Sequence, residues 1–156
     1  MGGTGWEHVV RYAGSVEESL DKLHREVFAS GRFQYWVDED GLEVPASYED
    51  FVSRRISYNE PEGGTHSVLD VYKVAAAADY EDDLRAERYY DKLYPLSDQE
   101  AIRVFGTGRP TLDDWERRKD IAEFGRLHQA RFSGRCVVLF DGDAAALLAV
   151  WGSSGY

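Results

Sequence analysis

Cysteine is nearly absent from this sequence, which limits both its covalent structure and the compartment that suits it. Cys136 is the single cysteine among 156 residues, so no disulfide can form within the chain. A chain without disulfides fits a reducing cytoplasm, which is the localisation we predict. Cys136 stands at the start of an apolar stretch, and we expect it to be a small buried hydrophobic residue.

Long hydrophobic runs and targeting segments are lacking as well. The longest apolar run, residues 144–151, is the length of a strand and falls well short of the roughly 20 residues that span a bilayer. Residues 1–5 do not have the basic and then apolar character of a signal peptide. We predict one soluble domain, residues 1–156, with residues 1–5 as a flexible leader and residues 152–156 as a short tail.

Basic residues are few, and their shortage is concentrated in one part of the chain. The net charge is −11, and residues 1–102 contain 22 acidic side chains against 10 basic ones. Such a surface repels phosphate backbones and anionic lipids, so we predict no nucleic-acid partner and no membrane partner. The remaining partner classes are a small molecule and a protein, which is itself basic if charge guides the encounter.

Helix signals recur at four places. Residues 15–30 begin with the spacing of a capping box, Ser15 to Glu18, continue with an apolar stripe at helical spacing, and end before Gly31. A second capping box begins at Ser97, and Thr111 caps a helix that we expect to run past Leu127 with a bend near Gly125. A shorter helix is expected to start at Ser47.

The C-terminal part has the strongest strand signal. Residues 135–140 and 145–151 are apolar runs on either side of an Asp-Gly turn, which predicts a β-hairpin. Both faces of each run are apolar, which is typical of central strands that are covered on both sides. If helices cover one face, the other needs a curled sheet, a ligand pocket or a second subunit, and a homodimer through the hairpin is one of these alternatives.

Further strands are expected at residues 6–12, 32–37 and 65–74, with a turn at residues 38–41. Residues 75–94 fit either a helix or a loop, and Pro95 should end whatever forms there. The predicted fold class is therefore α+β, with a mostly antiparallel sheet of about four or five strands and three or four helices packed on it.

The segment around His66 is the best catalytic candidate. If residues 65–74 form a strand, His66, Asp70 and Tyr72 share one face, behind a pair of glycines. A histidine with a nearby carboxylate can act as a general acid or base. However, His66 and Asp70 would lie about 13 Å apart along a strand, so a substrate would have to bridge them. A half-exposed strand with a polar outer face explains the same residues.

Other candidate sites have simpler explanations. The glycines around Arg109 resemble an anion cradle, but a helix end, a connector and a helix start account for that segment. The histidines have no metal-ligand spacing, and we predict neither a metal nor a cofactor. His24 falls at the edge of the apolar stripe of its helix and is expected to be a packing histidine.

Two functional hypotheses remain open, and whether the protein is an enzyme is not decided by the sequence. The first is a non-catalytic, acidic and aromatic-rich protein-binding module, such as an immunity or antitoxin-like inhibitor or an accessory protein. Its expected binding residues are Tyr35, Trp36, Tyr89, Tyr90 and Arg109. The second is a small enzyme or ligand-binding protein with a pocket over the sheet, in which His66 is the acid or base beside Asp70 and Tyr72.

Overall fold

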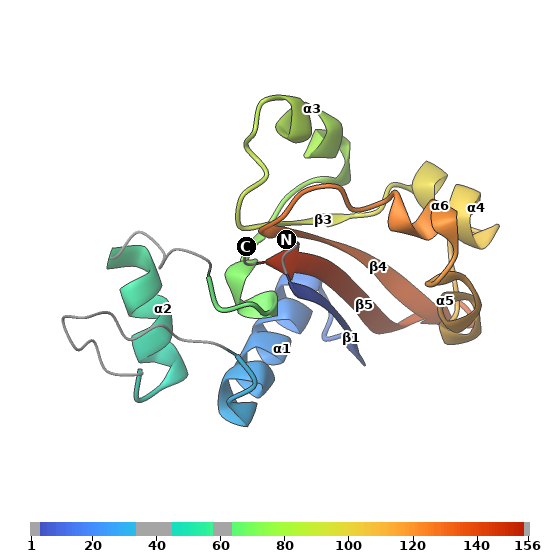
Figure 1. Ribbon diagram of the computed structural model, residues 1–156. Helices are drawn as coiled ribbons and strands as arrows, with labels where there is room; N and C mark the ends of the chain where they lie inside the picture. Colours follow the sequence, from blue (N-terminus) through green and yellow to red (C-terminus); the bar gives the residue numbers. More distant parts are fainter. Residues whose placement is uncertain (1–3, 34–44, 58–63, 155–156) are drawn as a thin grey trace.

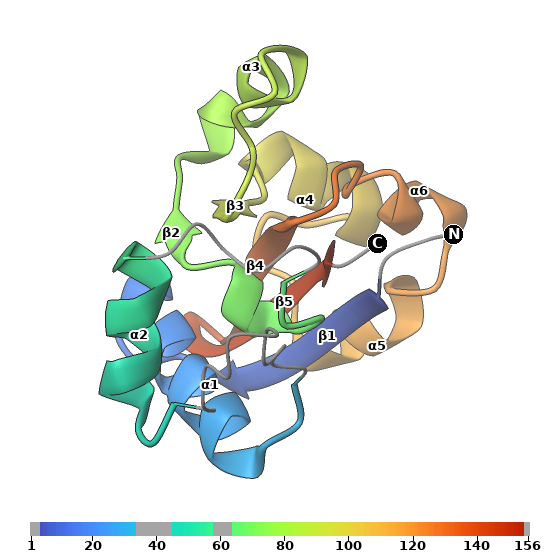
Figure 2. The ribbon, with the colours of Figure 1, turned by 60° about the vertical axis from the view of Figure 1, so that its left-hand side comes forward.

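A five-stranded mixed sheet with helices on both faces makes up the protein (Figures 1 and 2). The computed structural model describes residues 4–33, 45–57 and 64–154. The strands are β1 (Thr4–Arg11), β2 (Lys73–Val74), β3 (Lys92–Pro95), β4 (Ser133–Asp141) and β5 (Ala144–Ser154). The α-helices are α1 (Val16–Ser30), α2 (Tyr48–Ser57), α3 (Tyr80–Arg85), α4 (Asp98–Phe105), α5 (Leu112–Arg118) and α6 (Ala122–Gly125), and two 3-10 helices are η1 (Val68–Asp70) and η2 (Ala77–Asp79).

The sheet combines antiparallel and parallel pairs. Its order is β1-β5-β4-β3-β2, in which β1, β5 and β4 pair antiparallel while β4, β3 and β2 pair parallel. The predicted α+β class is confirmed, but the sheet is less antiparallel and the described residues hold more helices than we expected. Parallel neighbours need long crossovers, and the crossover from β3 to β4 contains α4, α5 and α6.

The predicted C-terminal hairpin is confirmed, and helices of the same chain cover both of its faces. On one face Cys136, Leu148 and Val150 pack in a core cluster with α1 and η1. On the other face Val137, Leu139 and Trp151 pack in a second cluster with α4, α5 and α6. The helices that begin after Ser15 and Thr111 therefore lie on opposite faces. A second subunit is therefore not needed to cover the hairpin. The homodimer stays a prediction, but the apolar faces of the hairpin no longer argue for it.

The local signals for helix ends and for the first strand correspond to the structure. The strand predicted at residues 6–12 is β1, and Ser15 caps α1 by accepting a hydrogen bond from the Glu18 backbone. Ser97 and Thr111 each form the full reciprocal capping box of their helices. The helix after Thr111 ends at Arg118, earlier than expected, and a separate short helix α6 precedes the next connection.

The predicted strand over residues 65–74 is wrong. His66 has a φ of 55°, residues 68–70 form the 3-10 helix η1, and only Lys73–Val74 pair as a strand. The Ser67 side chain accepts a hydrogen bond from the Leu69 backbone, which starts the tight turn. Val68, Leu69 and Val71 are all fully buried, so the burial does not alternate as a half-exposed strand requires.

The ambiguous residues 75–94 resolve into η2, α3 and β3, and Pro95 is the last residue of β3. The strand expected at residues 32–37 and the turn at residues 38–41 fall largely outside the described residues, as do Tyr35 and Trp36. Among the residues that are described, none of the helices combines the length and the apolar character that a bilayer crossing requires.

Trp6 lies across the centre of the sheet where two glycines face each other. Gly134 of β4 pairs with Gly152 of β5, and Trp6 of β1 pairs with Gly152 on its other side. A β-carbon at Gly152 would meet the Ser133 carbonyl at 2.4 Å and the Trp6 ring at 2.6 Å. Glycine is required at this position because the indole and the backbone occupy the side-chain space.

Candidate functional site

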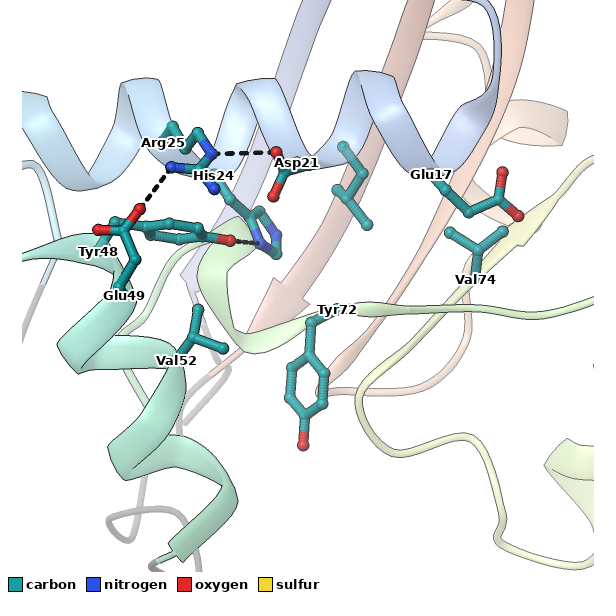
Figure 3. A pocket seen from close by; sticks show the side chains of 10 residues that line it. Glu17, Asp21, His24, Arg25, Tyr48, Glu49, Val52, Tyr72 and Val74 are labelled. Carbon is teal, nitrogen blue, oxygen red and sulfur yellow. Dashed lines mark hydrogen bonds and ion pairs between the residues drawn. The ribbon is translucent and has the colours of Figure 1, made fainter.

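An open pocket of about 450 Å³ lies between α1, α2 and the segment that joins η1 to β2 (Figure 3). Its lining combines aliphatic and aromatic side chains with charged groups and one histidine. Ten residues line it: Glu17, Leu20, Asp21, His24, Arg25, Tyr48, Glu49, Val52, Tyr72 and Val74. They come from three segments far apart in the chain, so the pocket exists only in the folded protein.

His24 is the most buried polar residue of the pocket, with 2% of its surface exposed. It lies on the inner face of α1, one helical turn after Leu20, and its Nε2 atom is 3.0 Å from the Val68 carbonyl oxygen. Because a carbonyl only accepts, Nε2 carries a proton and donates it to Val68. In the neutral ring, Nδ1 is then an acceptor.

Tyr48 of α2 completes this polar pair. Its hydroxyl oxygen is 3.5 Å from Nδ1 of His24, and Figure 3 shows the hydroxyl directed toward the imidazole. With the ring neutral, the phenol is the donor in this long contact. This contact joins α2 to α1 at the base of the pocket, beside an aromatic cluster of Phe28, Phe51 and Tyr48.

Arg25 spans the rim. Its guanidinium lies 4.7 Å from the centre of the Tyr48 ring and binds Asp21 at 3.0 Å and Glu49 at 2.9 Å. The hydrogen bonds that Arg25 donates, first to Glu49 and then to Asp21, raise the pKa of Arg25, and the bond to Glu49 lowers the pKa of that carboxyl. With Glu17 included, the lining carries three carboxylates against one guanidinium.

The structure does not bring together the predicted trio of His66, Asp70 and Tyr72. The His66 Nδ1 atom lies 3.0 Å from the Thr4 hydroxyl, beside β1. Tyr72 lines the pocket, but its hydroxyl is directed away from His24 (Figure 3) and donates to Asp91 at 3.3 Å. The shared face on which the trio depended is absent, because the segment is not a strand.

Asp70 is buried in η1 and does not line the pocket. Its Oδ1 atom accepts a 2.7 Å hydrogen bond from the Thr65 backbone, and its Oδ2 atom has no hydrogen-bond partner within the described part of the chain. Burial raises the pKa of Asp70, although its hydrogen bonds partly oppose the effect. A β-carbon at Gly64 would approach the carboxylate to 2.7 Å, and Gly64 has a φ of 63°, so the turn over Asp70 requires glycine.

The predicted binding residues lie on separate surfaces. Tyr89 and Tyr90 stack at 4.8 Å between their ring centres, and Tyr90 is 51% exposed. Arg109 is exposed and pairs with Asp143 in the hairpin turn, away from the pocket lining. Tyr35 and Trp36 lie outside the described residues.

Sequence reasoning placed His24 at the core edge but did not find its role in a pocket. Helical spacing identifies the buried face of α1, which is a local property. The Val68 carbonyl and the Tyr48 hydroxyl are contributed by segments 44 and 24 residues away. Only the turn of η1 aims that carbonyl at the ring, and no sequence signal predicted the turn.

Sequence reasoning also missed the burial of Arg135, which has no exposed surface. Its guanidinium lies 3.9 Å from the centre of the Tyr80 ring and forms a two-bond ion pair with Glu100, at 2.7 and 3.0 Å. Three backbone carbonyls, of Tyr94, Pro95 and Leu127, accept its remaining hydrogen bonds.

Comparison with protein-family models, with curated proteins and with solved structures gives no match to this chain. Across the described ranges, no three His, Cys, Asp or Glu side chains are grouped so that they could hold a metal ion. The functional argument therefore depends on the pocket and on the exposed surfaces described above.

Proposed function

We propose that this protein binds a small organic molecule in the pocket between α1 and α2. The observation that carries the proposal is the contact between the buried His24 and the half-buried Tyr48 in an open pocket of about 450 Å³. This volume lies in the range of small-molecule sites, about 300–1,000 Å³. The proposal keeps Tyr72 from the original ligand-binding hypothesis and replaces His66 with His24.

The lining supports this function because it combines apolar contact with oriented polar groups. Leu20, Val52 and Val74 provide the apolar surface, and the His24–Tyr48 pair is held in one orientation by the Val68 carbonyl. A site of this kind binds a ligand by excluding water from its apolar part and orients it through few polar contacts.

The direct test is a screen of metabolite-sized compounds by thermal shift, with each hit confirmed by calorimetry. Val52→Trp should fill the pocket and abolish binding. Ser53→Trp is the matched control, because Ser53 is the next residue of α2, is exposed and does not line the pocket. Hits that bind the wild type and Ser53→Trp but not Val52→Trp support the proposal.

A screen without hits, or hits that bind Val52→Trp as well as the wild type, would contradict it. Tyr48→Phe provides a milder second variant that keeps the pocket volume and removes only the hydroxyl. Circular dichroism establishes that each variant is folded before its binding is compared.

A second candidate function is the acidic protein-binding module, which the stacked Tyr89–Tyr90 pair favours. Tyr90 is exposed, its ring lies 6.4 Å from that of Phe132, and the neighbouring Glu87 is exposed as well. Rigid exposed aromatic residues are typical of protein interfaces. A partner isolated from the native host should lose affinity for Tyr90→Ala and associate more slowly as salt rises. A partner indifferent to both changes would exclude this surface.

A further inference from the structure

We infer that the ligand of the α1–α2 pocket is an organic cation with an apolar body, an inference that rests on the proposed function. It draws on three features of the lining: the hydrogen-bond polarity that the Val68 carbonyl imposes, the excess of carboxylates on the rim, and the apolar and aromatic walls.

The hydrogen-bond polarity follows from a chain of contacts that starts in the backbone. The Val68 carbonyl accepts from Nε2 of His24, so Nδ1 of the neutral ring accepts the proton of Tyr48. A phenol oxygen that donates its own proton still accepts hydrogen bonds. A ligand that meets this oxygen must bring a donor, as ammonium and guanidinium groups do.

The rim adds negative charge. Asp21 and Glu49 share a single cation, Arg25, and Glu17 makes no ion pair with any described residue. The formal charge of the lining is therefore −2 when His24 is neutral. A carboxylate or phosphate ligand would meet three carboxylates, whereas the only guanidinium among the lining residues already binds two of them.

The walls suit the remainder of such a ligand. Leu20, Val52 and Val74 offer aliphatic contact, and the rings of Tyr48 and Tyr72 border the same space. A cation beside a tyrosine ring is attracted by the ring quadrupole, as Arg25 already is over the ring of Tyr48. The preferred ligand thus has one cationic head and a hydrocarbon or aromatic body.

Three probes of equal size and different charge test this inference. They are 4-phenylbutylamine, 4-phenylbutanol and 4-phenylbutanoate, titrated into the full chain by calorimetry at neutral pH and low salt. Since one charge pair at 4 Å in water is worth about fivefold in affinity, the amine should bind roughly tenfold or more tightly than the alcohol. The carboxylate should not bind detectably.

Charge-neutral variants show whether the preference arises in the pocket. Glu17→Gln should weaken amine binding by about threefold to fivefold and leave alcohol binding unchanged. Glu18→Gln is the matched control, because the substitution removes the same charge at the next residue of α1, which does not line the pocket. Equal effects of the two variants would show a general charge effect and overturn the inference.

The outcomes separate this inference from the proposed function. If the alcohol or the carboxylate binds as well as the amine, and Val52→Trp abolishes that binding, the pocket is a ligand site but its ligand is not a cation. If none of the probes binds and the screen yields only neutral or anionic hits, the inference fails alone. If neither probes nor screen give a pocket ligand, both proposals fail.

Discussion

Two arginines of this protein have similar neighbours, a tyrosine ring and carboxylates, but differ in how far they are exposed to solvent. Arg25 lies over the ring of Tyr48 and binds Asp21 and Glu49, while Arg135 lies over the ring of Tyr80 and binds Glu100. The Arg25 side chain is 51% exposed, whereas Arg135 has no exposed surface.

The difference lies in how completely each guanidinium is satisfied. A guanidinium has five N–H donors, and Arg135 has five acceptor contacts, two on Glu100 and three on backbone carbonyls. Nothing is left there for a ligand, so that cluster joins β3, β4 and the helices of one face. The Arg25 cluster is open to solvent and borders a pocket. The same kind of side chain is therefore fully enclosed in one place and lies at the open rim of a pocket in the other.

The largest expected effect comes from breaking the closed cluster. Arg135→Met should lower the free energy of unfolding by about 3–5 kcal/mol, because it leaves the partly buried Glu100 without its counter-charge. Burial by itself would raise the pKa of Glu100, but the hydrogen bonds with Arg135 and Ser97 and the charge of Arg135 together outweigh it, so that the pKa is lowered. Urea unfolding at pH 7 measures the loss. The double variant Glu100→Met, Arg135→Met should recover most of it, and a single variant as stable as the wild type would refute the comparison.

A smaller loss is expected from Tyr94→Phe, which tests the neighbouring carboxylate of the same closed region. The buried Tyr94 hydroxyl donates to Asp83 at 2.6 Å, and Lys92 and Arg88 bind the same carboxylate. Removing the hydroxyl should cost about 1–3 kcal/mol, since a hydrogen bond to a charged acceptor is lost. Chemical unfolding of Tyr94→Phe checks this, with the exposed Tyr90→Phe as control. Equal stability of the two variants would contradict the expectation.

A weaker effect should appear as a dependence on pH at Asp70. Burial raises the pKa of Asp70, so the fold favours its neutral form. Its contribution to stability is therefore fully present below its ordinary pKa of 3.8 and is lost as pH rises through the raised value. The stability of the wild type relative to Asp70→Asn should fall as the pH rises above the ordinary carboxyl pKa. Parallel pH profiles of the two proteins would show that Asp70 ionises as freely in the folded state as in the unfolded state.

The smallest effect on stability is expected from Arg25→Ala. Exposed ion pairs contribute little because solvent screens them and the side chains lose entropy. The thermal midpoint should be nearly unchanged, while the pocket becomes more negative and binds 4-phenylbutylamine more tightly. A loss of stability as large as that of Arg135→Met would show that the two clusters are equivalent after all.

Much of the fold could be predicted from the sequence, but the candidate site could not. The caps at Ser15, Ser97 and Thr111 and the turn at Gly142 each depend on residues a few positions apart, and all of them are found in the structure. The segment after His66 was misjudged because its burial is decided by the elements above and below it. The parallel pairing of β2, β3 and β4 could not be predicted, because no short turn joins these strands in the sequence.

The sequence by itself therefore determined the α+β class, the capped helices and the C-terminal hairpin. The tertiary structure decided that α1 and α5 cover opposite faces, that Arg135 is enclosed, and that His24, Tyr48 and Val68 meet at one pocket. The physical reason is the distance along the chain over which the deciding interactions act. Caps, turns and amphipathic stripes are local free-energy differences that neighbouring residues set, whereas enclosure and pocket formation depend on which distant surfaces pack together.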